Sequence, residues 1–263
     1  MNSIEKHGGK VFALATAIQK EHEGKGFWQI ICTNPTIGRN LLHNLSGDVS
    51  DREGLHQFQN SIKNLTYALL SVIEEQFFPE EAGVCKSRMD ETFRVACNTI
   101  PNLVFGQIAR GGDRPTFIAK EYLEHQYQCN PIPRLHAASQ RKGERDAMDA
   151  DVTVKGRTEL KGKTLLILEQ AVATVTTIPK ALREWIRTCE SKPDRVIVGA
   201  IHTSHESLTR LQNMGNPDDP NDPLHKIQVD VVAALLHNGI NEKGYLTGPG
   251  CGDVGAKDAG LPD

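Results

Sequence analysis

A threonine-rich segment between an apolar run and a helix-like stretch has the residue types of an anion site. It spans residues 169–177 and follows residues 164–168, whose apolar character predicts a buried strand. Where a strand leads through a loop into a helix, unpaired amides and the helix dipole both favour a bound anion. The hydroxyls of Thr174, Thr176 and Thr177 add donors and can cap the helix. The segment therefore predicts a phosphate site.

Three charged side chains are candidates for work on the same ligand. Glu169 ends the predicted buried strand, a place where α/β sheets bind ligands and where a carboxylate is rarely structural. Arg110 precedes Gly111 and Gly112, and Arg141 stands in a charged, apolar-poor stretch. Both arginines would suit an anionic ligand, and the alternative is that they are ordinary surface residues.

Residues 239–255 are rich in glycine and contain one proline. A backbone approaches a flat ring closely only where side chains do not block it. This stretch therefore predicts contacts to a planar ligand, and the alternative is a glycine-rich turn without one.

Composition excludes several kinds of partner. The formal charge of −3, from 33 acidic and 30 basic residues, gives no broad field for nucleic acid or an anionic membrane. The six cysteines are scattered without CxxC pairs, and the ten histidines lack HxH or HxxxH spacing, so no metal site is predicted. The apolar residues 11–18 are too few for a membrane span or signal segment, and we expect a cytoplasmic protein.

Hydrophobic periodicity predicts the elements that position these residues. Helices are expected around Lys10–Glu21 and Gln57–Glu75, and a short strand at Trp28–Cys32. After an apolar run at residues 103–108, strands and helices alternate. The alternating elements are strands 164–168, 195–201 and 228–234 and helices 178–189 and 206–213. This order predicts an α/β fold with a parallel sheet flanked by helices.

We expect one domain over residues 1–263, with a helical extension at 1–28 and a ligand loop at 239–263. A polar helix or loop is expected before the run at 103–108. Asn216–Pro223, rich in proline and aspartate, predicts an exposed insertion, and Lys142–Asp151 a mobile loop.

Several motifs resemble the uracil phosphoribosyltransferase family, which has the type I phosphoribosyltransferase fold. The stretch Gly239–Gly255 resembles the family's uracil-binding region. Matching segments precede it in the family's order, so that the resemblance covers about residues 30–255. These segments are Asn34–Thr36, Ile108–Gly112, Gln140–Glu144 and Leu166–Thr177.

The resemblance implies a role for each matched residue. The catalytic candidates are Glu169, Arg110, Arg141 and Asp253. Donor and phosphate binding is expected of Gly111, Gly112, Ala173, Thr174, Val175, Thr176 and Thr177. Base binding is expected of Tyr245, Leu246 and Gly252. Magnesium is expected to arrive with the donor pyrophosphate, with no metal ligand assigned to the protein, and the family resemblance implies a homodimer.

The donor segment departs from the family pattern. Glu169 and Gln170 replace Asp and Pro, and Val175 and Thr176 replace two glycines that let the backbone curl around a phosphate. β-Branched residues restrict the backbone there, so that donor binding is expected to weaken. Three functions follow as hypotheses: phosphoribosyl transfer to uracil, transfer with a different substrate, or a non-catalytic regulatory paralogue that binds a base or nucleotide.

Overall fold

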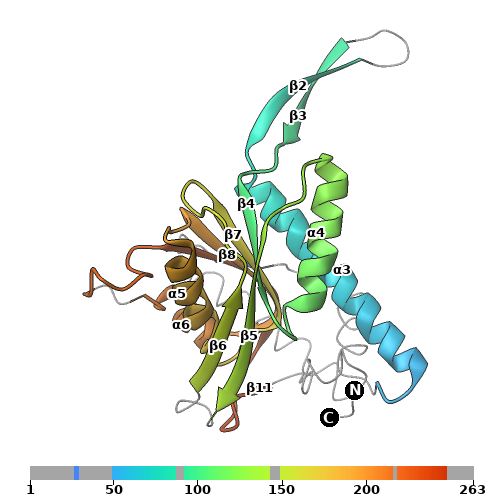
Figure 1. Cartoon of the computed structure of the whole chain (residues 1–263). Coiled ribbons are helices and arrows are strands. Elements are labelled where there is room, and N and C mark those ends of the chain that lie inside the picture. The colour runs from blue at the N-terminus through green and yellow to red at the C-terminus, as the bar shows by residue number, and fades with distance from the viewer. Residues whose placement is uncertain (1–26, 30–48, 87–91, 143–148, 216–217, 248–263) are drawn as a thin grey trace.

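The computed structural model describes residues 27–29, 49–86, 92–142, 149–215 and 218–247, and a seven-stranded sheet forms its centre (Figure 1). The strand order is β1-β9-β8-β7-β4-β5-β6. These strands are β1 (Phe27–Gln29), β4 (Leu103–Ile108), β5 (Arg134–Lys142), β6 (Asp149–Lys155), β7 (Thr164–Ala171), β8 (Arg195–Ser204) and β9 (Gln228–His237). All neighbours pair in parallel except β5 and β6, which are antiparallel.

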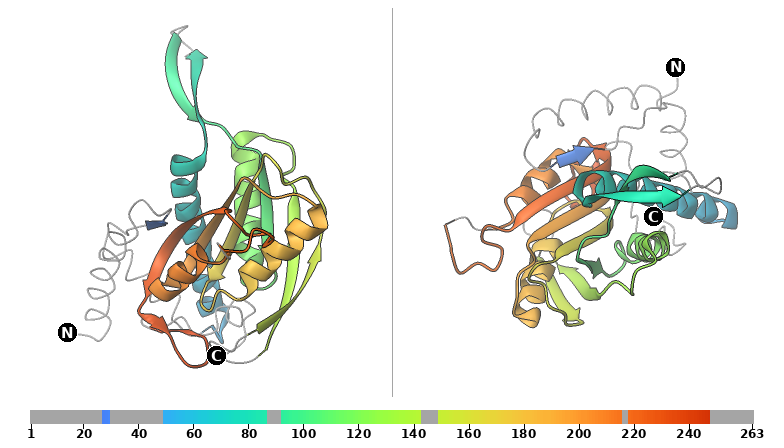
Figure 2. Two further views of the ribbon diagram at one scale, coloured as in Figure 1. Left: turned by 90° about the vertical axis from the view of Figure 1, so that its left-hand side faces the viewer. Right: turned by 90° about the horizontal axis from the view of Figure 1, so that it is seen from above.

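Among the described residues, two helices pack on each face of the sheet (Figure 2). Helices α3 (Arg52–Phe77) and α4 (Asp113–Tyr127) pack on one face, and α5 (Thr177–Cys189) and α6 (His205–Gln212) on the other. The predicted α/β class, a parallel sheet flanked by helices, is confirmed.

Helix α3 forms where the sequence has apolar residues at helical spacing. Phe58, Ile62 and Leu69 are fully buried against the sheet. The Asp51 carboxylate accepts a hydrogen bond from the Gly54 amide and caps the first turn. The helix predicted at 57–75 is confirmed and extends further at both ends.

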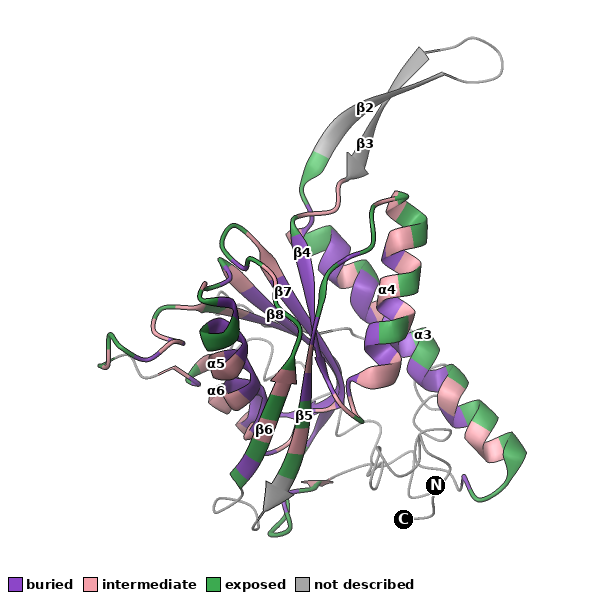
Figure 3. Cartoon of the chain, in the orientation of Figure 1, coloured by how far each residue is buried: buried purple, intermediate pink, exposed green. Residues whose placement is uncertain are grey.

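The central strands are buried on both faces, as Figure 3 shows. Every residue of β4 is buried, which explains why the strand is apolar apart from Gln107. Trp185 of α5 packs so closely on Gly106 that a Cβ atom there would lie 2.8 Å from the indole. The sheet and α5 are therefore in direct contact beneath the loops that follow β4 and β7.

Four predictions about individual segments need correction or remain open. The polar helix or loop expected before residue 103 is wrong, because β2 (Glu80–Lys86) and β3 (Thr92–Asn98) form an antiparallel hairpin. The mobile loop expected at Lys142–Asp151 is wrong at both ends, because Lys142 is the last residue of β5 and the edge strand β6 begins at Asp149. Within Asn216–Pro223, Asp222 is buried and accepts two hydrogen bonds from Arg183, so the segment is not wholly exposed. The helix predicted at Lys10–Glu21 lies outside the described residues.

The chain after β9 forms a small antiparallel hairpin of β10 (Gly239–Ile240) and β11 (Leu246–Thr247). The Asn241 side chain accepts hydrogen bonds from the Lys243 and Tyr245 amides and closes the turn. Among the helices of the described ranges, none is both long enough and apolar enough to cross a membrane.

Candidate functional site

The loops after β4 and β7 meet at the carboxyl edge of the sheet. The Gln170 amide donates a 3.0 Å hydrogen bond to the Gly111 carbonyl. A Cβ atom on Gly111 would lie only 2.3 Å from Oε2 of Glu169, so the carboxylate lies against the glycine backbone. Glu169 is 7% exposed. The structure thus brings the Glu169 carboxylate and the glycine turn into contact at the edge where such sheets bind ligands.

Arg110 begins this turn with a left-handed backbone, at φ 74°. Asp113 holds the turn, because its Oδ2 accepts a 2.8 Å hydrogen bond from the Arg110 amide while its Oδ1 accepts one from Gln107 Nε2. The Arg110 side chain is exposed. A left-handed non-glycine residue is uncommon and occurs where surrounding structure imposes it, often at ligand sites.

The threonine-rich loop after β7 has the second unusual backbone. Val175 has φ 59°, and the following Thr176 is right-handed helical. A left-handed residue beside a right-handed one turns successive amides toward one point, the concave arrangement called a nest that binds anions. Although a β-branched residue restricts the backbone, Val175 adopts a φ that favours glycine. The weaker donor binding expected from the lost glycines stays a prediction.

The start of α5, which this loop leads into, has no cap of its own. Thr176 makes no side-chain capping hydrogen bond, and the first turn has no acidic residue. Within the part of the chain that the structure describes, the buried Thr177 hydroxyl has no hydrogen-bond partner. By contrast, Asp113 lies in the first turn of α4, and Ser204 caps α6. Helix α4 also lacks a side-chain cap, so that of these three helices α5 is the one with neither a side-chain cap nor an acidic residue in its first turn, which suits an external anion.

The φ of Val175 leads to a prediction about stability. We expect Val175→Gly to raise the free energy of unfolding by about 1 kcal/mol, because relief of roughly 1–3 kcal/mol of backbone strain exceeds the entropic cost of a glycine. Urea unfolding measures this difference. The control is Val154→Gly, a valine in β6 that is also partly buried and should lose stability when truncated. Equal destabilisation by the two changes would contradict strain at Val175.

A buried histidine pair lies at the carboxyl ends of β8 and β9. Nδ1 of His202 and Nε2 of His237 are 3.0 Å apart, and the two residues are 0% and 1% exposed. Burial lowers the pKa of His237 to about 4, so this ring is neutral near pH 7. The pairing joins residues of different strands, and no local spacing in the sequence indicated it.

The remaining predicted residues are only partly placed. Tyr245 is exposed and precedes Leu246 of β11, in the hairpin that follows β9. Arg141 lies in β5 opposite Ala150 of β6, beyond the part of β5 that pairs with β4. Gly252 and Asp253 lie outside the described residues. Within the described ranges, no three His, Cys, Asp or Glu side chains form a metal-binding cluster.

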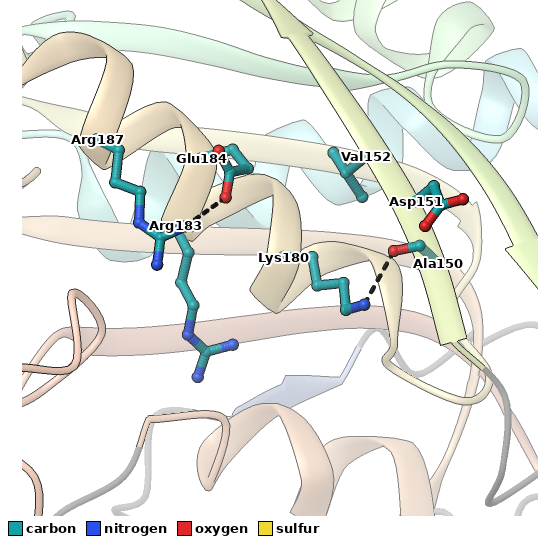
Figure 4. A pocket seen from close by; sticks show the side chains of 7 residues that line it. All are labelled: Ala150, Asp151, Val152, Lys180, Arg183, Glu184 and Arg187. Atoms are coloured by element: carbon teal, nitrogen blue, oxygen red, sulfur yellow. Dashed lines mark hydrogen bonds and ion pairs between the residues drawn. The ribbon is translucent and has the colours of Figure 1, made fainter.

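A pocket of about 400 Å³ lies elsewhere, between α5 and β6 (Figure 4). It is lined by Ala150, Asp151, Val152, Lys180, Arg183, Glu184 and Arg187. Each of its basic side chains has an acidic partner: Lys180 with Asp149, Arg183 with Asp222 and Arg187 with Glu184. None of the predicted site residues lines it, and with its cations already paired it is a poor anion site.

Comparison with known proteins supports the predicted resemblance. No protein-family model matches the chain. The chain is 26% identical over 155 residues to the "Uracil phosphoribosyltransferase" of Aquifex aeolicus (strain VF5), a match that covers 58% of this chain and 62% of that protein. The match thus spans less than two thirds of that relative's length. The sequence resemblance to uracil phosphoribosyltransferases is confirmed at this level.

A solved structure shares the fold of this chain. The AQ2163 protein from Aquifex aeolicus aligns with a TM-score of 0.59 at 19% identity, over 89% of this chain and 99% of that one. An adenine phosphoribosyl transferase from Trypanosoma brucei, in complex with AMP, pyrophosphate and ribose-5-phosphate, aligns with a TM-score of 0.44 at 8% identity. That alignment covers 81% of this chain and 85% of the other. The first alignment shows a common fold across nearly the whole of the AQ2163 chain.

Proposed function

We propose that this chain, which resembles uracil phosphoribosyltransferases in sequence, transfers a phosphoribosyl group from phosphoribosyl pyrophosphate to a pyrimidine-like base such as uracil. The observation that carries the proposal is the nest at the N-terminus of α5, which has no side-chain cap and lies in the loop that follows the strand ending near Glu169 and its contact with Gly111. A phosphate site next to a carboxylate and a glycine turn suits a ligand with both phosphates and sugar hydroxyls.

In the proposed reaction, a ring nitrogen of the base forms a bond to the anomeric carbon of the donor. The bond from that carbon to the pyrophosphate oxygen breaks, pyrophosphate leaves with the electron pair, and the base loses its nitrogen proton to solvent. The amides and hydroxyls of residues 173–177 would hold the 5-phosphate. Arg110 and Arg141 would neutralise the pyrophosphate, and Glu169 would accept hydrogen bonds from the ribose hydroxyls.

The base would bind beside the chain segment after β9. Tyr245, Leu246 and Gly252 are proposed to contact the base, and Asp253 to lie near the ribose. In support, the β10–β11 hairpin follows directly from β9, whose carboxyl end lies at the same edge of the sheet as the ends of β7 and β8. This arrangement would allow base and donor to share one edge of the sheet.

Magnesium fits the site as a partner of the donor. The ion prefers carboxylate, phosphate and water oxygens, and Glu169 is the carboxylate next to the proposed pyrophosphate turn. When bound, magnesium would neutralise charge on the leaving pyrophosphate. With no metal cluster among the described residues, most of its ligands would be donor oxygens and water.

A non-catalytic role is the alternative, and one observation favours it. The longer side chain of Glu169 fills the space against Gly111, where a pyrophosphate oxygen would otherwise approach the turn. A protein with a weakened donor site could still bind a base or nucleotide and act as a regulatory paralogue. A changed substrate is the intermediate case.

The proposal is tested by calorimetry with phosphoribosyl pyrophosphate and magnesium, together with an assay for uridine monophosphate formed from uracil. We expect binding and turnover, and Arg110→Ala should weaken donor binding by roughly 10- to 100-fold through loss of one charged contact. Arg187→Ala, in the α5–β6 pocket, is the matched control and should leave binding unchanged. Binding of uracil or its nucleotide without donor binding or turnover would favour the regulatory alternative.

We also propose a homodimer. The β2–β3 hairpin extends away from the sheet (Figure 1), and an isolated two-stranded hairpin is only marginally stable in water. A second copy that covers this hairpin would stabilise it. The single-domain organisation and the cytoplasmic location remain predictions.

A further inference from the structure

Helix α6 holds the threonine-rich loop from behind through two consecutive carbonyls. The Ser207 hydroxyl donates a 2.6 Å hydrogen bond to the Ala173 carbonyl. Nη1 of Arg210, one turn further along α6, donates a 3.4 Å hydrogen bond to the Thr174 carbonyl. The loop that forms the proposed phosphate site is therefore attached to a helix that follows a different strand, β8.

Ser207 is fixed in place by its surroundings. It is fully buried, and its amide donates to Oγ of Ser204, the residue that caps α6. The two hydroxyl oxygens are 2.8 Å apart. Because the single hydroxyl proton of Ser207 is directed to Ala173, the Ser204 hydroxyl must donate to Ser207. This chain of donors runs from the α6 cap to the loop.

Arg210 is likewise oriented. Its Nη2 forms a 2.7 Å ion pair with Oε1 of Glu206, one turn earlier on the same helix. The pair fixes the plane of the guanidinium, so that Nη1 remains directed at the Thr174 carbonyl.

The direction of these carbonyls fixes the direction of the loop amides. The described residues have no cis peptide bond, and in a trans peptide the C=O and the following N–H point in opposite directions. Since the carbonyls of Ala173 and Thr174 face α6, the amides of Thr174 and Val175 face away from it. The next residues, Val175 and Thr176, have the left-handed and right-handed backbones of the nest.

We propose that Ser207 and Arg210 are positioning residues that hold the amides of this loop toward a phosphate monoester. The inference rests on the proposed function, since it assigns these residues to the same donor site. Their hydrogen bonds hold Val175 in the left-handed backbone conformation that glycine adopts freely. In this way they compensate for the two glycines that Val175 and Thr176 replace.

The test compares Ser207→Ala and Arg210→Ala with Thr209→Ala. Thr209 lies on the exposed side of the same helix, and its hydroxyl donates only to His205 within α6. Amide hydrogen exchange is measured in the free proteins for the peptide that covers residues 172–178. Calorimetry then measures binding of ribose 5-phosphate and, separately, of uracil.

We expect faster exchange of the loop peptide in Ser207→Ala and Arg210→Ala, but not in Thr209→Ala. Ribose 5-phosphate should bind about tenfold more weakly to the first two variants, the effect of losing one hydrogen bond that organises an anion site. Uracil affinity should not change. A general loss of stability would weaken both ligands alike, so that the difference between them identifies positioning.

Two results would overturn the inference, and they are distinguishable from failure of the proposed reaction. Unchanged exchange in both variants would show that α6 does not hold the loop, whether or not the protein catalyses the proposed transfer. If exchange is faster in the two variants but the wild-type protein does not bind ribose 5-phosphate, then α6 holds a loop that has no anion site. Wild-type binding of ribose 5-phosphate without turnover would leave the inference standing while the transfer reaction fails.

Discussion

Gly112→Ala should lower the free energy of unfolding by about 2–4 kcal/mol, a value typical of a side chain forced against fixed backbone. A Cβ atom there would lie 2.6 Å from the Ile108 carbonyl oxygen and 2.9 Å from that of Leu168. Both atoms belong to central strands, so neither can move without disturbing the ladder between β4 and β7. Urea or thermal unfolding measures the loss.

The neighbouring glycine provides a graded comparison. In Gly111→Ala the new methyl group meets the end of the Glu169 side chain, which can rotate, and the loss of stability should be smaller. Gly239→Ala is the control, because its Cβ would meet only Thr247 Oγ1 at 3.7 Å. If Gly112→Ala unfolds at the same denaturant concentration as Gly239→Ala, the result would contradict close packing of the glycine turn against β4 and β7.

The sheet and its covering helices could be predicted because their periodicity is strong. Helix α3 buries residues at helical spacing, and β4 and β8 each contain a buried run of mostly apolar residues. The β2–β3 hairpin could not be predicted in this way, because its two strands form a separate two-stranded sheet and residues 80–94 include many charged side chains. Strand β6 was also missed, since an edge strand with exposed charged residues has the composition of a loop.

The site could be predicted only where its residues are contiguous. The Glu169 strand end and the glycine turn are motif features, and the structure brings them into contact. The left-handed backbone of Val175 opposes the preference of a β-branched residue, because contacts from α6 outweigh it. These contacts join residues more than thirty positions apart, and the His202–His237 pair does the same. No local pattern in the sequence carries such information.

The largest effect on activity is expected at Glu169. Glu169→Gln keeps the shape of the side chain but removes its charge, and should lower kcat/KM for uridine monophosphate formation by roughly 100- to 1,000-fold. In the proposed reaction, this loss corresponds to two charge-assisted hydrogen bonds from the ribose hydroxyls to Glu169, each strongest in the transition state, where positive charge develops on the sugar. Initial rates at varied donor concentration give the value.

Two further variants separate charge from size. Glu159→Gln makes the same change at an exposed position before β7 and should leave the rate unchanged. Glu169→Asp retains the charge but withdraws the carboxylate from Gly111, which opens the space that the longer side chain fills. This variant should bind phosphoribosyl pyrophosphate more tightly than the wild type, because an oxygen of the pyrophosphate could then reach the turn. A Glu169→Gln protein as active as the wild type would remove Glu169 from the reaction, and weaker donor binding by Glu169→Asp would show that the longer carboxylate contributes to the donor site.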